Sequence, residues 1–368
     1  MAYCLNCRKE SKLITKALEL CVDCIRKDFK KVLPQIEKAH SKSRKAFSLP
    51  FKPPKDADGI KCNYCVNECK IGEGKTGYCG LRYNSGGKLY PDNPDEGNLS
   101  WYFDPLPTNC VAEWVCPAGT SCGYPAYSYS REPEYGYKNL AVFFQSCSFN
   151  CLFCQNWHYR EKIFSPEQIT SSQLADVINE KTACICYFGG DPTPQLPFAI
   201  NFSEMVLERN KDRILRICWE TNGAMNSSFL KKMADLSLNS GGCIKFDLKT
   251  FSEELNIALC GITNKRTKGN FEYLAKLSEK RKEPPFLIAS TLLIPGYVDE
   301  KEIFKIAKFI AKLNPEIPYS LLGFYPCFYI NDLPTTSKKH AENCKKIALE
   351  AGLKRVKIGN IYLLGEAY

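Results

Sequence analysis

The sequence predicts an α/β protein in which six parallel strands form a partial (β/α)6 TIM-like barrel behind a cysteine-rich N-terminal extension. From about residue 138 onward, apolar runs of strand length alternate with amphipathic segments of helix length. The chain also has 21 cysteines in 368 residues, and most of them cluster before or directly after the first of these runs. Buried strands that alternate with helices are typical of a parallel sheet covered by helices. Six units are too few for a closed eight-stranded barrel.

The expected elements follow from this alternation. The apolar runs that predict strands are 140–144, 183–188, 214–219, 244–248, 286–293 and 319–324. The segments that predict helices are 171–180, 227–236, 270–280, 300–313 and 337–351. In folds of this kind reactive groups gather at the carboxyl ends of the strands. The residues that directly follow the strands are therefore the candidates for a functional site.

Composition divides the chain into four segments. Near the N-terminus, apolar residues recur at helical spacing from Ile25 to Ile36, with Pro34 expected to interrupt or kink that helix. A proline-rich stretch follows and is typical of a linker. The expected domains are a basic zinc-ribbon-like module with a helix (1–47), a linker (48–60), a cysteine-rich metal-binding region (61–137) and the partial barrel (138–368).

Two C-x2-C pairs near the N-terminus are spaced as in a structural zinc site. Thirteen residues separate the pairs, and this arrangement is typical of four-thiolate zinc modules. A segment this small cannot bury enough apolar surface to fold without its metal. The four expected zinc ligands are Cys4, Cys7, Cys21 and Cys24.

The remaining cysteines outside the first strand end fall into three sets. One set could bind zinc or an iron–sulfur cluster, since spacing alone does not decide between them: Cys62, Cys65, Cys69 and Cys79. A second set is a candidate auxiliary site, although nothing in its spacing forces the three together: Cys110, Cys116 and Cys122. The scattered cysteines are expected to be small buried apolar side chains: Cys184, Cys186, Cys218, Cys243, Cys260, Cys327 and Cys344.

The most informative motif directly follows the first expected strand. Cys147, Cys151 and Cys154 have the spacing C-x3-C-x2-C. Four-iron clusters normally have four cysteine ligands, so three thiolates on one loop would leave one iron open to a small molecule. Zinc is the alternative metal, but zinc sites favour two cysteine pairs that lie a dozen or more residues apart. The loop therefore predicts a [4Fe-4S] cluster that takes part in chemistry.

The next three strand ends carry residues suited to a small polar ligand. A Gly-Gly-Asp-Pro segment can expose backbone carbonyls to an ammonium group, and the carboxylate and amide after the following strand could bind ribose hydroxyls. An Asp-x-Lys pair shares one face of its strand, and the phenylalanine before the third loop cysteine offers a face for a purine. Taken alone, the Gly-Gly-Asp-Pro segment could be an ordinary turn, the phenylalanine a core residue and the Asp-x-Lys pair a structural ion pair. The candidates are Phe153, Gly189, Gly190, Asp191, Glu220, Asn222, Asp247 and Lys249.

Together these motifs resemble those of radical S-adenosylmethionine (radical SAM) enzymes. The chain is most similar to the branch that looks like pyruvate formate-lyase activating enzyme, and within it to the AmmeMemoRadiSam-type proteins. The resemblance covers about residues 60–368 and leaves out the N-terminal zinc-ribbon-like module. The similar segments are 62–82, 147–157, 247–261, 292–303 and 352–360.

The resemblance implies an oxidoreductase or a radical transferase with a radical SAM-type partial barrel. Its cofactors would be a [4Fe-4S] cluster on the three-cysteine loop and S-adenosylmethionine, which the reduced cluster would cleave to methionine and a 5′-deoxyadenosyl radical. Gly190 and Asp191 would flank the amino group of the methionine part. Asp247 and Lys249 would contact the ribose or the carboxylate. The implied partners are a protein or peptide substrate and a reducing donor such as ferredoxin or flavodoxin.

Two further functions stay open at this point. One is a cobalamin-dependent methyltransferase, although the chain lacks the Asp-x-His-x-x-Gly signature of cobalamin binding. The other is RNA modification, because residues 1–55 hold 14 Lys and Arg against 5 Asp and Glu, and basic segments suit acidic partners. A non-enzymatic metal-binding scaffold is disfavoured by the intact three-cysteine loop.

The sequence also predicts a location. Residues 1–4 begin no apolar signal core, and no apolar stretch approaches the length of a membrane span. We therefore expect a cytoplasmic protein without membrane contact. Since thiols stay reduced in that compartment, the clustered cysteines are interpreted as metal ligands and not as disulfides.

Overall fold

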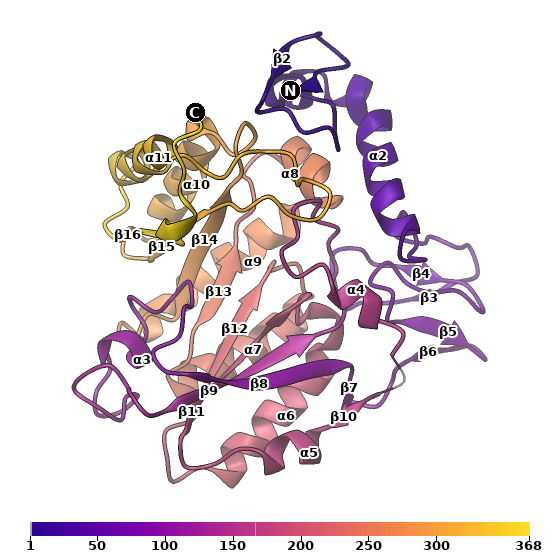
Figure 1. Cartoon of the computed structure of the whole chain (residues 1–368). Coiled ribbons are helices and arrows are strands. Elements are labelled where there is room, and N and C mark those ends of the chain that lie inside the picture. The colour runs from indigo at the N-terminus through magenta and orange to yellow at the C-terminus, as the bar shows by residue number, and fades with distance from the viewer. Residues whose placement is uncertain (1, 166) are drawn as a thin grey trace.

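The computed structural model describes residues 2–165 and 167–368. Its centre is an eight-stranded sheet in which seven parallel strands follow one another in chain order (Figure 1). An antiparallel strand, β8 (Leu99–Pro105), pairs with the first of them at one edge. The parallel strands are β9 (Lys138–Phe144), β11 (Thr182–Gly189), β12 (Arg216–Thr221), β13 (Ile244–Asp247), β14 (Leu287–Leu293), β15 (Tyr319–Gly323) and β16 (Val356–Gly359).

This sheet confirms the α/β class and contains all six expected strands. The prediction of six parallel strands was wrong by one, because β16 is a seventh. Its four residues, Val-Lys-Ile-Gly, are too short and too polar to stand out as an apolar run. β8 and β16 are the two edges and do not pair with each other in the described part of the chain, so the sheet is open. A curved partial barrel stays a prediction.

Helices connect the strands. They are α5 (Ser171–Asp176), α6 (Leu196–Arg209), α7 (Ser227–Ser240), α8 (Glu253–Cys260), α9 (Lys265–Leu277), α10 (Glu300–Leu313) and α11 (Lys338–Glu350). Five of them match predicted segments, whereas α6 and α8 were missed. Prolines precede and begin α6. They weaken a helical pattern in the sequence, although the first turn of a helix tolerates proline.

The two faces of the sheet differ in character, because successive side chains of a strand point to opposite faces. On the helix face, Tyr187 donates to or accepts from Ser203 of α6 at 2.6 Å, and Trp219 donates to Ser237 of α7 at 3.1 Å. Aromatic and aliphatic side chains of the strands and helices pack together on this face in the main core. The opposite face carries thiols, carboxylates and a lysine, and we call it the site face.

The N-terminal segments add small elements around the sheet. Residues 2–47 form β1 (Ala2–Tyr3), β2 (Glu10–Ser11), α1 (Val22–Lys27) and α2 (Phe29–Lys45). Pro34 lies inside α2, and the predicted interruption occurs instead at Asp28, between the two helices. The elements of the next region, and the short ones after the cysteine loop, are β3 (Ile60–Lys61), β4 (Lys70–Ile71), β5 (Tyr83–Ser85), β6 (Lys88–Tyr90), β7 (Glu96–Gly97), α3 (Pro117–Thr120), α4 (Tyr159–Lys162) and β10 (Ile169–Thr170).

The N-terminal module packs directly against the sheet domain. Arg26 forms two hydrogen bonds with Asp299, at 2.7 and 2.8 Å, and the Tyr297 hydroxyl donates to the Leu20 carbonyl at 2.9 Å. Apolar residues of the module belong to the same continuous core as the sheet. In Figure 1, α2 runs along one side of the sheet domain toward β3 and β4. The module is therefore part of one compact body.

A search of the described helices finds none that is both long enough and apolar enough to cross a bilayer.

Candidate functional site

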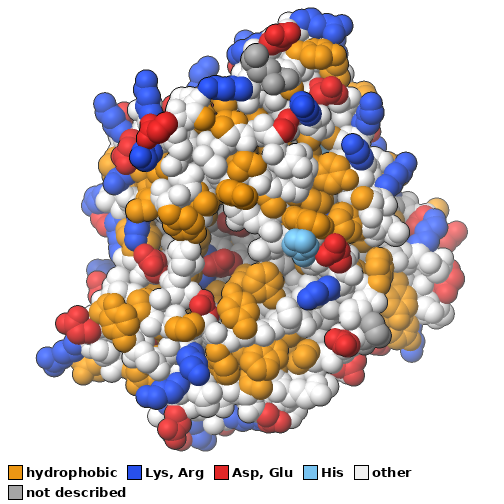
Figure 2. Space-filling view, viewed as in Figure 1, with side chains coloured by type: hydrophobic (Ala, Val, Ile, Leu, Met, Phe, Trp, Pro, Cys, Tyr) orange, Lys and Arg blue, Asp and Glu red, His pale blue; other side chains and the backbone are white. Residues whose placement is uncertain are grey.

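A cavity of about 550 Å³ lies at the carboxyl edge of the parallel strands. Figure 2 shows a hollow on this face with acidic side chains inside and hydrophobic side chains around it. Every residue predicted from the strand ends lines this cavity, although they come from four different strand ends. They are Cys147, Cys151, Phe153, Cys154, Gly189, Gly190, Asp191, Glu220, Asn222, Asp247 and Lys249.

The three-cysteine loop follows β9 directly and is held by the end of α8. The backbone N–H groups of Asn150 and Leu152 donate to the carbonyls of Cys260 and Leu259, each at 2.9 Å. Among the residues that the structure describes, the three loop sulfurs do not all lie within 4.8 Å of one another, unlike a set of ligands gathered on one ion.

The glycine pair after β11 lies against the start of this loop. Gly190 N–H donates to the Phe144 carbonyl at 2.9 Å, and Gly189 has a φ of +108°. A Cβ at Gly190 would lie 2.3 Å from the Ser146 carbonyl oxygen, and one at Gly189 would lie 2.5 Å from the Phe144 nitrogen. Only glycine allows this close approach of two backbones.

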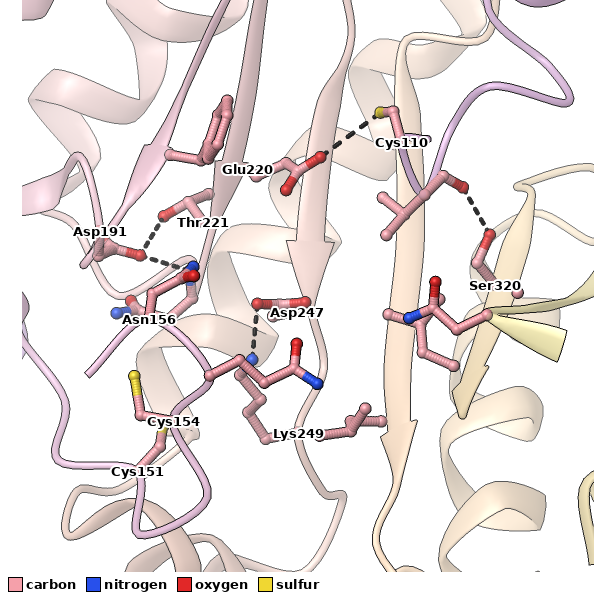
Figure 3. A pocket seen from close by; sticks show the side chains of 18 of the residues that line it. Cys110, Cys151, Cys154, Asn156, Asp191, Glu220, Thr221, Asp247, Lys249 and Ser320 are labelled. Carbon is pink, nitrogen blue, oxygen red and sulfur yellow. Dashed lines mark hydrogen bonds and ion pairs between the residues drawn. The ribbon is translucent and has the colours of Figure 1, made fainter. Parts of the chain in front are cut away.

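Asp191 joins the ends of two strands. Its buried carboxylate accepts from the backbone N–H of Thr193 at 2.9 Å and of Asn222 at 2.7 Å, and from the Thr221 hydroxyl at 3.1 Å (Figure 3). Burial raises the pKa of this carboxyl even though hydrogen bonds act to lower it. The carboxylate therefore holds β11 and β12 in place. An ammonium group would have to be met by the backbone carbonyls of this segment.

Asn222 and Glu220 are also engaged within the chain. The Asn222 amide donates to the Ser148 hydroxyl at 2.9 Å and lies 3.9 Å from the Cys147 sulfur, so it supports the cysteine loop. Glu220 forms an ion pair with Lys245 at 2.9 Å, and its side chain is 32% exposed in the cavity wall. Of these two, Glu220 is the better placed to meet a ribose.

Asp247 and Lys249 form the opposite part of the wall. The Lys249 ammonium contacts Asp247 at 2.6 Å (Figure 3). The Ser290 hydroxyl donates to the other Asp247 oxygen at 2.8 Å. Burial alone would lower the pKa of Lys249, but the charge of Asp247 outweighs it and the pKa lies above the ordinary value. Lys249 therefore stays cationic and can bind a carboxylate. Its ammonium also lies 5.9 Å from the centre of the Phe153 ring.

The part of the chain that forms most of this cavity also matches a known family. Residues 141–310, from β9 to α10, match the sequence profile of the Radical SAM superfamily. The chain contains a radical SAM domain. The profile leaves out the first 140 residues, including all accessory cysteine groups, and the last two strands.

Three relatives share parts of the sequence. An uncharacterized protein of Methanocaldococcus jannaschii is 25% identical over 83% of this chain and 83% of its own length. A second protein of that organism, provisionally named a glycyl-radical enzyme activating enzyme, is 32% identical over 48% of this chain and 64% of its own length. The isethionate sulfite-lyase activating enzyme of Desulfovibrio desulfuricans is 32% identical over 37% of this chain and 40% of its own length. The matches to both activating enzymes thus cover less than two thirds of those proteins.

A residue that sequence analysis missed gives a test of whether the radical SAM domain fits an iron–sulfur cluster. Arg160 is 1% exposed and lines the cavity that holds the three loop thiols. One of its nitrogens donates to Asn150 at 3.0 Å, whereas Nε and Nη1 have no partner within the described chain. Buried polar groups normally have partners, and an anionic cluster with sulfide acceptors would supply them. The residues therefore fit the expected cofactor.

The N-terminal helix α2 reaches this loop through a buried polar contact. The Asn150 amide donates to His40 Nδ1 and to the Ser43 hydroxyl, each at 2.8 Å, and His40 Nε2 donates to the Ala258 carbonyl at 3.0 Å. All three side chains are buried. Burial, assisted by the charges of nearby arginines, lowers the pKa of His40 to about 4, so the ring is neutral at pH 7.

The low pKa of His40 predicts a pH-dependent stability. Its unfolded pKa is about 6.5 and its folded pKa about 4, so its contribution is complete above pH 6.5 and falls as the pH decreases toward 4. Between about pH 7 and 5.5 the loss amounts to about 1 kcal/mol. We expect the stability difference between wild type and His40→Gln to shrink by that amount in urea unfolding. A difference that stays constant over this range would contradict the assignment.

The four cysteines of the N-terminal module form the tightest group of potential metal ligands. Cys4, Cys7, Cys21 and Cys24 have sulfurs that all lie within 4.8 Å of one another, and no other set in the described residues meets this criterion. Four thiolates at this separation suit one zinc ion. Zinc at this site stays a prediction, and the geometry is consistent with it.

Removing one of these predicted zinc ligands is expected to destabilise α2, the helix that supports the cysteine loop through His40 and Ser43. Cys7 is exposed, so Cys7→Ala removes a ligand with little loss of packing. We expect zinc content to fall by about one atom per chain and α2 to become sensitive to protease, because small zinc modules unfold without metal. Lys9→Ala is the matched control and should change neither quantity. Unchanged zinc content in Cys7→Ala would contradict this ligand set.

The two remaining predicted cysteine groups differ in geometry. One group lines a single small cavity, as a shared metal site requires: Cys62, Cys65, Cys69 and Cys79. Its metal, zinc or iron, stays a prediction. In the other group, Cys110 and Cys116 line a different cavity on the site face, whereas Cys122 donates to the Val115 carbonyl at 3.0 Å and does not line that cavity.

Proposed function

We propose that this radical SAM enzyme cleaves S-adenosylmethionine reductively and uses the product radical to modify or activate a protein or peptide. The observation that carries the proposal is the single cavity that joins the three-cysteine loop to the polar strand ends. Its volume of about 550 Å³ lies in the range of pockets for small molecules and cofactors. Bound there, a [4Fe-4S] cluster would supply the electron for carbon–sulfur bond cleavage.

The residues of the chain would bind and orient the cosubstrate. Cys147, Cys151 and Cys154 would hold the cluster. Lys249, kept cationic by Asp247 at 2.6 Å, would bind the methionine carboxylate. The backbone of the Gly-Gly-Asp-Pro segment would accept from the amino group. The Glu220 carboxylate would accept a hydrogen bond from a ribose hydroxyl, and the Phe153 ring would pack against the adenine.

The rim of the cavity supports a macromolecular substrate. Ile361 and Tyr362 line the cavity, and their side chains are 66% and 72% exposed. Exposed aromatic and aliphatic side chains at an opening favour contact with another protein. The names of two relatives, both activating enzymes, agree with a protein substrate.

Deuterium transfer tests this proposal. The reconstituted enzyme is incubated anaerobically with S-adenosylmethionine, dithionite and either a deuterated protein fraction or a deuterated RNA fraction. Because hydrogen abstraction moves an atom from substrate to product, we expect deuterium in 5′-deoxyadenosine with the protein fraction only. Tyr362→Ala should lower this enrichment without lowering total cleavage. Deuterium from RNA alone would overturn the protein assignment, and no 5′-deoxyadenosine at all would overturn the reaction.

The structure weakens the RNA alternative in one respect. Two of the basic residues that motivated it are used inside the chain: Arg26 pairs with Asp299, and Arg44 is 1% exposed with its guanidinium 3.6 Å from the Tyr78 ring centre. The basic surplus is thus partly structural. For the methyltransferase alternative, a cobalamin absorption band retained after supplementation and purification would favour methyl transfer.

A further inference from the structure

A second cavity, of about 150 Å³, lies on the site face on the amino-terminal side of the first. It shares a wall with the first cavity at Cys110 and Glu220. Six thiols line it: two come from the loop 106–122, three from β11 and β12, and one directly precedes β13. They are Cys110, Cys116, Cys184, Cys186, Cys218 and Cys243. The last four were predicted to be small apolar core residues. They are largely buried, but they surround a cavity with charged groups.

Three of these thiols form a row across adjacent strands. Cys186 is directly in register with Cys218. The next pair in register, Trp219 with Ile244, places Cys218 beside Cys243, and their sulfurs are 4.0 Å apart. Bulky branched side chains usually fill this position inside parallel α/β sheets that curve into barrels. In this chain three cysteine side chains occupy this position instead.

A buried lysine lies among the thiols. The Lys245 side chain is 3% exposed, and its ammonium lies 3.1 Å from Cys110 Sγ, 3.0 Å from Cys186 Sγ and 2.9 Å from Glu220. These three contacts use all three donors of an ammonium group. A neutral thiol is a weak acceptor, whereas a thiolate forms a charge-assisted bond. Two sulfurs that share one ammonium therefore suit the anionic, metal-bound form of cysteine.

We infer that this cavity holds a second metal cofactor, an iron–sulfur cluster bound by Cys110, Cys186, Cys218 and Cys243, with Lys245 donating to its sulfur ligands. Thiolates select soft metals and iron–sulfur clusters. In the part of the chain that the structure describes, no three of these sulfurs lie within 4.8 Å of one another, in contrast to the N-terminal group. The thiols thus surround a space and do not converge on one ion. Four cysteines ligate [2Fe-2S] as well as [4Fe-4S] clusters, and the 4.0 Å between the Cys218 and Cys243 sulfurs suits two ligands of one iron, as in the [2Fe-2S] form.

The loop 106–122 closes this site from the outside. The Trp114 indole donates to Ser320 at 3.0 Å, and the Ser320 hydroxyl donates to the Val111 carbonyl at 2.7 Å. Lys357 forms an ion pair with Glu113 at 2.8 Å. These contacts fix the loop over the strands, so Cys110 is held in place as the ligand from outside the sheet. A cluster there would be shielded from solvent.

Iron content in paired variants tests the inference. The starting protein carries Cys147→Ala, Cys151→Ala and Cys154→Ala, which removes the cluster of the radical SAM domain without touching the second cavity. To it are added either Cys186→Ala, Cys218→Ala and Cys243→Ala, or the control set Cys260→Ala, Cys327→Ala and Cys344→Ala. We expect the first addition to remove about two iron and two sulfide ions per chain and the control to remove none. Because the cysteines at 62–79 are intact in both, they cancel in the comparison.

Three results of this comparison would overturn the inference: equal iron content in both folded proteins, zinc in place of iron, or a Cys218–Cys243 disulfide in the anaerobic protein. Should the first variant fail to fold by circular dichroism, Lys245→Met in the otherwise wild-type holoprotein decides the question. It keeps all thiols, and we expect it to shift one electron paramagnetic resonance signal that does not respond to S-adenosylmethionine. If no such signal moves, the site is not a cluster. A failure here leaves the proposed function untouched, since that function depends on the first cavity.

Discussion

Cys151→Ala is expected to abolish 5′-deoxyadenosine formation, with a loss of more than about 1000-fold, or about 4 kcal/mol of barrier lowering. Cys151 lines the first cavity together with the other two loop thiols, and the loop 147–154 has no fourth cysteine. With only two protein ligands the cluster should not assemble at this site. Iron should fall by about four atoms per chain. Iron analysis and anaerobic cleavage assays with S-adenosylmethionine and dithionite measure both effects.

The control for this change is Cys344→Ala. Cys344 is also buried, but its sulfur contacts His340 at 3.6 Å, away from the cavity. This variant should keep its iron and its cleavage activity, which separates loss of a ligand from loss of a buried thiol. Cleavage at the wild-type rate in Cys151→Ala would show that the loop is not the cluster site, and the proposed function would then have no basis.

Arg160→Leu is expected to lower the midpoint potential of the cluster in the radical SAM domain. Arg160 is buried beside the loop thiols, and two of its nitrogens have no hydrogen-bond partner among the described residues. A positive charge there stabilises the more negative, reduced cluster. Hydrogen bonds to charged groups contribute about 1.5–3 kcal/mol, which corresponds to about 60–130 mV for one electron. The cluster should therefore be harder to reduce, and cleavage should slow with weak reductants.

Arg160→Lys is the matched variant, because it keeps the positive charge and loses the planar fork. We expect a smaller shift for this variant than for Arg160→Leu. A redox titration followed by electron paramagnetic resonance measures both potentials. Arg160 also donates to Asn150 at 3.0 Å, so iron content must be verified first. An intact cluster with an unchanged potential in Arg160→Leu would contradict the proposed role.

The carboxyl-edge residues could be predicted from the sequence because their signals are local. Three cysteines within eight residues and short motifs after apolar runs need no knowledge of distant contacts, and parallel strands bring their ends together. The roles of individual residues were harder to predict. Asp191 and Asn222 line the cavity, but their polar groups are already engaged within the chain. The Asp191 carboxylate accepts from the backbone N–H of Asn222, and the Asn222 side-chain amide donates to Ser148 of the cysteine loop.

Long-range contacts explain what sequence analysis missed. Lys245 meets Cys110 across 135 positions of sequence, and His40 meets Asn150 across 110. No periodicity or spacing encodes such pairs. For the same reason Cys184, Cys186, Cys218 and Cys243 looked like ordinary core residues, although they line a cavity that contains charged groups. The contact of the N-terminal module with the radical SAM domain is likewise visible only in the three-dimensional arrangement.

The contact between α2 and the cysteine loop has a consequence for how the protein matures. His40 lies well before the loop in the chain, whereas Ala258, which accepts its second hydrogen bond at 3.0 Å, lies about a hundred residues after it. During synthesis, the three-cysteine loop leaves the ribosome before its final support exists. Cellular iron-delivery factors should therefore meet a competent loop only after translation has passed α8, which makes cofactor loading a late event.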